Sequence, residues 1–98
     1  MYKIVYARQA LKDIKNLKAV RLDFKAKALI EIIRKNPFQN PPPYEKLIGN
    51  LSGLYSRRIN IQHRCVYQVY SEKIVINEIE YEGIVKIVRL WTHYGSVK

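Results

Sequence analysis

The prolines of this chain are confined to one short segment. All four lie between Pro37 and Pro43, in the stretch NPFQNPPPYEK that runs from Asn36 to Lys46. Proline has no backbone N–H to donate, and it disfavours the helical conformation of the residue before it. A helix must therefore end before Pro37, and no regular hydrogen-bonded element can form until the prolines end. The segment divides the chain into two parts, and each part has its own hydrophobic pattern.

The part before the prolines reads first as a strand and then as helices. Residues 2–6 are rich in β-branched and aromatic side chains, which predicts a first strand. Apolar residues then recur at helical spacing on two faces, one formed by Leu11, Ile14 and Leu17 and the next by Leu22, Ala26, Leu29, Ile30 and Ile33. We expect two helices, packed as a hairpin, after the first strand.

The part after the prolines has the pattern of strands. The sequence predicts a turn at Asn50–Gly53 and strands at about residues 45–48, 54–61, 64–70 and 84–91. In Ser71–Gly83 the stretch Lys73–Ile79 also alternates, which indicates an extended hairpin or an added edge strand. We therefore expect a single α+β domain over residues 1–98, in which an N-terminal strand and a two-helix hairpin pack on one face of a twisted antiparallel β-sheet.

The charge of the chain is large and unevenly distributed. The formal net charge is +10, and residues 71–83 contain four acids and one lysine, which leaves 17 basic and 4 acidic residues elsewhere, a balance of +13. A charge of this size attracts polyanions, among which RNA is the obvious candidate in the cytoplasm. Lys12, Lys15 and Lys18 form a stripe at helical spacing that could contact RNA phosphates.

Two classes of protein are excluded by the composition. Cys65 is the only cysteine, so neither a disulfide framework nor a zinc site built from cysteines can form, and we expect a buried packing thiol. No apolar run approaches the roughly 20 residues of a membrane-spanning helix, and the N-terminus lacks a signal-peptide pattern. We expect a cytoplasmic protein.

Polar and charged residues follow the prolines in a distinctive order. They are Glu45, NLSG at Asn50–Gly53, SRRI at Ser56–Ile59, HR at His63 and Arg64, and HY at His93 and Tyr94. This set resembles the Txe/YoeB family of RelE-like toxins, the toxic halves of bacterial type II toxin–antitoxin pairs. The resemblance implies the RelE-like (YoeB) fold and a ribosome-dependent mRNA endoribonuclease that inhibits translation.

The same residues offer what metal-free RNA cleavage needs. The ribose 2′-OH is the nucleophile, so the protein must supply a base, cations for the phosphorane and an acid for the leaving oxygen. Glu45 can be the base and His93 the acid, while Arg58 and Arg64 can hold the charge. The resemblance assigns the same roles and adds Tyr94, which would orient the substrate. A metal site fits poorly because the acids are scattered and the two histidines lie thirty positions apart, so we expect no cofactor.

Other residues allow more than one interpretation at this level. Arg57 and Arg58 are adjacent on a strand and must leave opposite faces, so Arg57 is interpreted as a snorkelling or partner-binding residue. His63 could be a second catalytic histidine, order the start of its strand or pack against Tyr55. The candidates for binding RNA or the ribosome are Lys12, Lys15, Lys18, Lys46, Arg57 and Tyr55.

The resemblance also implies partners. They are an acidic antitoxin of the YefM type, the ribosome with its mRNA, and operator DNA bound only through the antitoxin complex; a homodimer is compatible with this set. Two other functions remain open on the residues alone. One is a non-enzymatic toxin of the ParE type on the same scaffold, and the other is an RNA-binding module.

Overall fold

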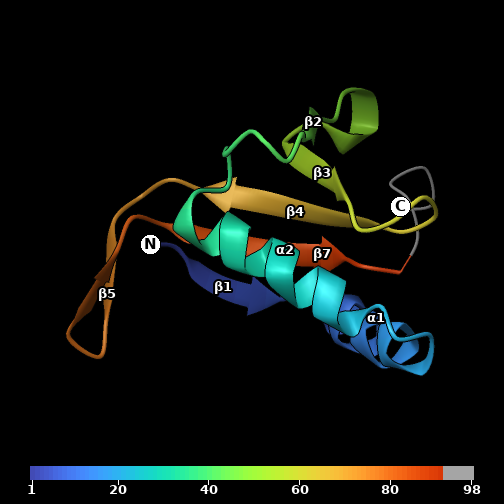
Figure 1. The fold of residues 1–98 in the computed structure, drawn as a ribbon. Coiled ribbons are helices and arrows are strands. Elements are labelled where there is room, and N and C mark those ends of the chain that lie inside the picture. The colour runs from blue at the N-terminus through green and yellow to red at the C-terminus, as the bar shows by residue number, and fades with distance from the viewer. Residues whose placement is uncertain (92–98) are drawn as a thin grey trace.

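A computed structural model describes residues 1–91 of the chain. In chain order the elements are β1 (Lys3–Tyr6), α1 (Arg8–Ala19), α2 (Asp23–Lys35), β2 (Glu45–Lys46), the 3₁₀ turn η1 (Gly49–Leu51), β3 (Leu54–Arg58), β4 (Arg64–Tyr70), β5 (Ile74–Ile76), β6 (Ile79–Tyr81) and β7 (Ile84–Arg89). Both helices lie on one face of the sheet (Figure 1). The predicted α+β fold is confirmed, and no helix within residues 1–91 is long and apolar enough to cross a membrane.

The main sheet has five strands in the order β1-β7-β4-β3-β2. Neighbouring strands are antiparallel from β2 to β7, but β1 runs parallel to β7, with Lys3 opposite Ile84. The sheet is therefore mixed, and the expectation of a wholly antiparallel sheet is corrected at this edge. A hydrophobic pattern fixes which side chains are buried, but it does not fix the direction in which the first strand pairs with the last.

The core lies between the helices and the sheet. The residues of α1 and α2 that the sequence placed on apolar faces supply most of the helical side, and alternate residues of β4 and β7 supply the other. Its buried members include Ala10, Leu17, Ala26, Leu29, Ile30, Ile33, Cys65, Tyr67, Val85, Ile87 and Leu90. Cys65 is fully buried in this core, which confirms its packing role, and the burial raises the pKa of its thiol to about 12.

The proline segment is fastened to the sheet by Arg57. This side chain is fully buried, and its guanidinium donates to the carbonyl oxygens of Pro42 (2.6 Å) and Pro37 (2.9 Å) and to the hydroxyl of Tyr67 (2.9 Å). It also lies 5.0 Å from the ring centre of Tyr44. The interpretation of Arg57 as a snorkelling, partner-binding or RNA-binding residue is therefore corrected, because its guanidinium does not reach the surface. Its donors satisfy carbonyls that the prolines leave without sheet partners, and they hold the chain that leads into Glu45.

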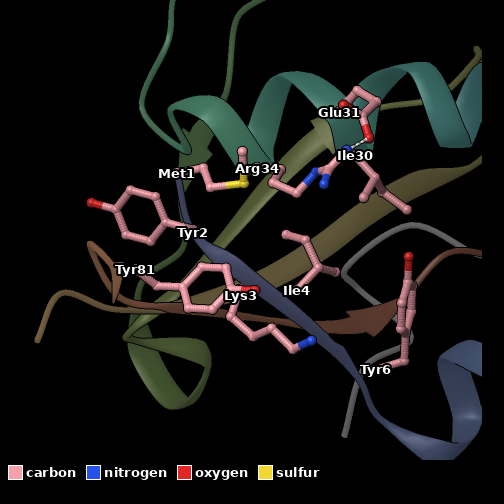
Figure 2. Close-up of a pocket in the computed structure, with 9 residues that line it drawn as sticks. All are labelled: Met1, Tyr2, Lys3, Ile4, Tyr6, Ile30, Glu31, Arg34 and Tyr81. Atoms are coloured by element: carbon pink, nitrogen blue, oxygen red, sulfur yellow. Dashed lines mark hydrogen bonds and ion pairs between the residues drawn. The ribbon is translucent and has the colours of Figure 1, made fainter. Parts of the chain in front are cut away.

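Residues 71–83 form a separate two-stranded hairpin of β5 and β6. Its turn residues Asn77 and Glu78 have φ of 50° and 67°, the left-handed conformation that tight hairpin turns require. The hairpin leaves the sheet where β4 ends and β7 begins (Figure 1). At its base Tyr81 lies beside Lys3, whose Nζ is 5.9 Å from the centre of the Tyr81 ring (Figure 2).

Candidate active site

Strand register brings four polar residues to one face of the sheet. Glu45 of β2 lies opposite Ser56 of β3, and Arg58 of β3 lies opposite Arg64 of β4. Directly opposed residues share a face, and so do residues two apart in a strand. Ser56 and Arg58 therefore join the two cross-strand pairs into a single cluster at the end of β3 and the start of β4.

Arg64 is the centre of this cluster. Its Nε donates to the Ser56 hydroxyl at 2.6 Å, and its Nη2 lies 3.0 Å from a carboxylate oxygen of Glu45. The Arg64 side chain is only 12% exposed, whereas that of Glu45 is 52% exposed. Ser56 is itself buried, so its hydroxyl offers the Nε–H of Arg64 an acceptor in a fixed position. The sequence identifies Ser56 only as part of the SRRI motif and assigns it no role.

A cavity of about 230 Å³ opens above the cluster. It is lined by Pro43, Tyr44, Glu45, Arg58 and Arg64. Arg58 is exposed and makes no side-chain hydrogen bond or ion pair with any residue from 1 to 91. Two arginines placed opposite each other repel, and the single carboxylate of Glu45 balances only one of them. The cavity therefore carries a net positive charge and is suited to an anion such as a phosphodiester.

The remaining predicted catalytic residues, His93 and Tyr94, lie outside the described residues. Trp91 is the last residue that the structure describes, and it follows the end of β7 closely. Among residues 1–91, no three His, Cys, Asp or Glu side chains are grouped closely enough to hold a metal ion.

His63 takes a structural position. Its ring stacks on Trp91 with 4.3 Å between ring centres, and its backbone N–H donates to Asn60 Oδ1 at 2.6 Å. The ring does not line the cavity of Glu45 and Arg64 and does not pack on Tyr55. Within the described chain, its buried Nδ1 has no hydrogen-bond partner. Burial lowers the pKa of His63, although the nearby Asp13 carboxylate opposes the effect.

This pKa shift predicts a pH dependence of stability. An unfolded chain takes up a proton on His63 near pH 6.5, its ordinary pKa, while the folded protein resists it. The free energy of unfolding should be unaffected by His63 above that pH and should fall as the pH drops below it, since the unfolded state then binds more protons. His63→Phe keeps an aromatic ring against Trp91 but cannot take up a proton. The urea midpoint of this variant should therefore change less between pH 7.5 and pH 5.5 than the midpoint of the wild type. An equally steep dependence in the variant would contradict the assignment.

The predicted RNA-binding residues are not gathered at the cavity. Lys12, Lys15 and Lys18 are exposed along α1, and Lys46 is exposed on β2 but on the face opposite to Glu45. The ring of Tyr55 is half-buried and contacts the rings of Tyr67, Phe38 and Tyr44. Tyr55 is thus a member of an aromatic cluster against the proline segment, and its assignment as a base-stacking residue stays a prediction.

A second cavity, of about 250 Å³, lies between the edge strand β1 and helix α2. Figure 2 shows Tyr2, Lys3 and Tyr6 around it, with the Glu31–Arg34 ion pair on the helix side. None of the predicted site residues within 1–91 lines this cavity. The three predicted catalytic residues that the structure describes, Glu45, Arg58 and Arg64, line the cavity beside β2 instead.

Comparison with known proteins places these features in a family. The model of the YoeB-like toxin of bacterial type II toxin–antitoxin systems matches residues 6–83. Toxin YoeB of Escherichia coli (strain K12) is 39% identical to this chain over 61 residues, which cover 62% of this chain and 73% of that toxin.

Solved structures share the fold. The YoeB/ParE toxin from Agrobacterium tumefaciens aligns with a TM-score of 0.77 at 26% identity, covering 94% of this chain and 99% of that one. A chain of the heterotetrameric YoeB–YefM toxin–antitoxin complex from Staphylococcus aureus aligns with a TM-score of 0.69 at 31% identity, covering 96% and 99%. The family predicted from the sequence is confirmed: this chain belongs to the YoeB-like toxins of bacterial type II toxin–antitoxin systems.

Proposed function

We propose that this single-domain toxin is a metal-independent, ribosome-dependent mRNA endoribonuclease that inhibits translation. The observation that carries the proposal is the cavity in which one carboxylate, Glu45, stands beside two arginines, Arg58 and Arg64. A net positive cavity with one proton acceptor fits a phosphodiester whose neighbouring hydroxyl must lose a proton. A protein that only bound RNA would not need the carboxylate, which repels phosphate.

The reaction is a transesterification. The ribose 2′-oxygen attacks phosphorus, its proton passes to the Glu45 carboxylate, and the bond from phosphorus to the 5′-oxygen breaks while His93 protonates that oxygen. Arg64, oriented by Ser56, and Arg58 hold the charge on the phosphorane, and Tyr94 orients the substrate. In the free protein Glu45 is paired with Arg64, so an incoming phosphate would compete for the guanidinium and release the carboxylate to act as base.

The partners follow from the charge distribution and from the relatives. Exposed Lys12, Lys15, Lys18 and Lys46 would contact ribosomal RNA, because phosphate contacts of this kind position a protein without reading sequence. A YefM-type antitoxin with an acidic segment would cover the basic surface. Operator DNA would be bound only by the resulting toxin–antitoxin complex. A structure of the S. aureus YoeB dimer makes a homodimer reasonable for this chain as well. With these partners, the toxin would act in the cytoplasm.

The test is to map the RNA ends that the toxin produces. On translating ribosomes the protein should cut mRNA and leave 2′,3′-cyclic phosphate and 5′-OH ends, and cells expressing it without its antitoxin should stop making protein. Ends with 5′-phosphate would show that water is the nucleophile and would overturn the mechanism. Growth arrest without RNA cleavage would favour a non-enzymatic toxin. RNA binding without growth arrest would favour an RNA-binding module.

A further inference from the structure

Asp13 is a buried carboxylate that the proposed reaction does not use. It lies on α1 between Lys12 and Ile14, in a helix whose lysine stripe faces solvent, yet its side chain is fully buried against the sheet. Burying a carboxylate is unfavourable unless several donors satisfy it. The donors it has found indicate which part of the chain it holds in place.

Its donors lie almost entirely at the end of β7. Asp13 Oδ2 accepts hydrogen bonds from Arg89 Nε (2.9 Å) and from the backbone N–H groups of Leu90 (2.9 Å) and Trp91 (3.3 Å). Its other oxygen accepts from Gln9 Nε2 at 3.2 Å. Burial on its own would raise the pKa of Asp13, but these hydrogen bonds outweigh it and hold the pKa below its usual range. The charged carboxylate thus binds two successive backbone amides just after the strand ends.

Two other features fix the same stretch of chain. The pairing of β7 with β4 slips by one residue, because Val66 pairs with Arg89 whereas Tyr67 pairs with Ile87. Such a bulge bends the strand and changes the direction of the chain beyond it. One residue after Leu90, the ring of Trp91 is held by stacking on His63. The chain is therefore constrained from the helix side, from the sheet and from the β3–β4 loop just before His93.

We propose that Asp13 is a positioning residue for the general acid: by binding the amides of Leu90 and Trp91, it fixes the backbone two residues before His93 in the sequence. This inference rests on the proposed function, since it assumes that His93 protonates the leaving oxygen. Asp13 does not line the cavity of Glu45, Arg58 and Arg64, so its effect must pass through the backbone of the chain after β7.

Asp13→Asn is the informative variant. An asparagine keeps the shape but offers one oxygen, so either the β7 amides or Gln9 must lose their acceptor. Single-turnover cleavage at saturating toxin should fall by roughly tenfold or more, because small misplacements of a catalytic group are costly. The toxin concentration that gives half-maximal rate should stay unchanged, since the lysines and arginines are intact. Glu80→Gln, an equal change of charge on the exposed hairpin, should leave both quantities unaltered.

A second substrate separates positioning from general damage. An mRNA with sulfur in place of the bridging 5′-oxygen at the mapped cleavage site releases a thiolate, which needs no proton from an acid. Asp13→Asn should cleave this RNA at nearly the wild-type rate, while Arg64→Ala should remain slow on both substrates. Arg89→Lys removes the Nε donor but keeps the charge. It should also cleave ordinary RNA slowly and the sulfur-containing RNA at nearly the wild-type rate, with a smaller deficit. This variant replaces Asp13→Asn in the test if Asp13→Asn does not fold.

The possible results separate a failure of the Asp13 inference from a failure of the proposed endoribonuclease function. If the wild-type toxin cleaves neither RNA, the proposed function is wrong. If the wild type cleaves and Asp13→Asn retains the wild-type rate on ordinary RNA, Asp13 does not position the acid although the function stands. An equal deficit on the oxygen and sulfur substrates would overturn the inference as well, because it would mean that Asp13 only supports the fold.

Discussion

Arg64→Ala should slow single-turnover mRNA cleavage by at least about a hundredfold, and Glu45→Ala by a similar factor, because positioned catalytic groups typically contribute about 10²–10⁴-fold. Arg64 is held by Ser56 and Glu45, so its guanidinium is already oriented before a phosphate arrives. Removing it deletes the better-ordered of the two cations and leaves Glu45 without the partner that the phosphate would displace. Rates should be measured on programmed ribosomes at saturating toxin, with folding checked by circular dichroism.

The matched control is Lys46→Ala, which alters the residue next to Glu45 on the opposite face of β2. It should weaken docking in a salt-dependent way, and a higher toxin concentration should restore the full rate. Arg64→Lys keeps the charge but loses the planar fork, so it should recover little. A saturated rate for Arg64→Ala within a few-fold of wild type would rule out this arginine as a catalytic group.

Arg57→Met should reduce the free energy of unfolding by about 3 kcal/mol or more, because hydrogen bonds to a charged group are worth about 1.5–3 kcal/mol each and three of them would be lost. The Tyr67 hydroxyl still donates to the Pro37 carbonyl in the variant, so the Pro42 carbonyl is the acceptor that loses its donor. The change removes all three donors that Arg57 provides to Pro37, Pro42 and Tyr67. Urea denaturation followed by tryptophan fluorescence would measure the loss.

Arg58→Met is the control for this prediction, since it makes the same replacement one residue away on the exposed face. Surface substitutions usually change stability by no more than about 0.5 kcal/mol, so its midpoint should stay close to that of the wild type. Arg57→Met should therefore lose stability, whereas Arg58→Met should keep its stability but cleave RNA slowly. Equal midpoints for the two variants would mean that the contacts of Arg57 do not stabilise the fold.

The elements of this fold could be predicted from the sequence because each follows from a local pattern. The limits of β4, 64–70, agree with the prediction, and the helix before Pro37 ends at Lys35 as required. Strand β3 ends at Arg58 and β7 at Arg89, earlier than predicted, because the chain turns at residues 59–63 and bends toward Asp13 after Arg89. Alternation along β3 also correctly separated Arg57 from Arg58.

The partners of buried polar groups could not be predicted in this way. Alternation put Arg57 on the face opposite to Arg58, but nothing local indicates that the carbonyls of Pro37 and Pro42 fold over it. Asp13 stands in a lysine-rich helix and finds its main partners 76 to 78 residues later. Contacts of that sequence separation depend on the arrangement of the whole sheet. A local pattern therefore gives no reason to bury charged residues such as Arg57 and Asp13.

The β5–β6 hairpin has a consequence for how this lineage can diverge. Tyr70 and Ile84 are directly paired, so residues 71–83 leave and rejoin the sheet at neighbouring positions and contribute nothing to the buried cluster. Lengthening such a surface excursion adds little closure entropy, so its size can drift in descendants without disturbing the fold or the distant Glu45 cavity. Gly83 is the exception: a β-carbon there would come within 2.1 Å of the Tyr70 carbonyl oxygen. The hairpin can therefore vary in length and sequence, whereas any residue other than glycine at position 83 would clash with the backbone of Tyr70.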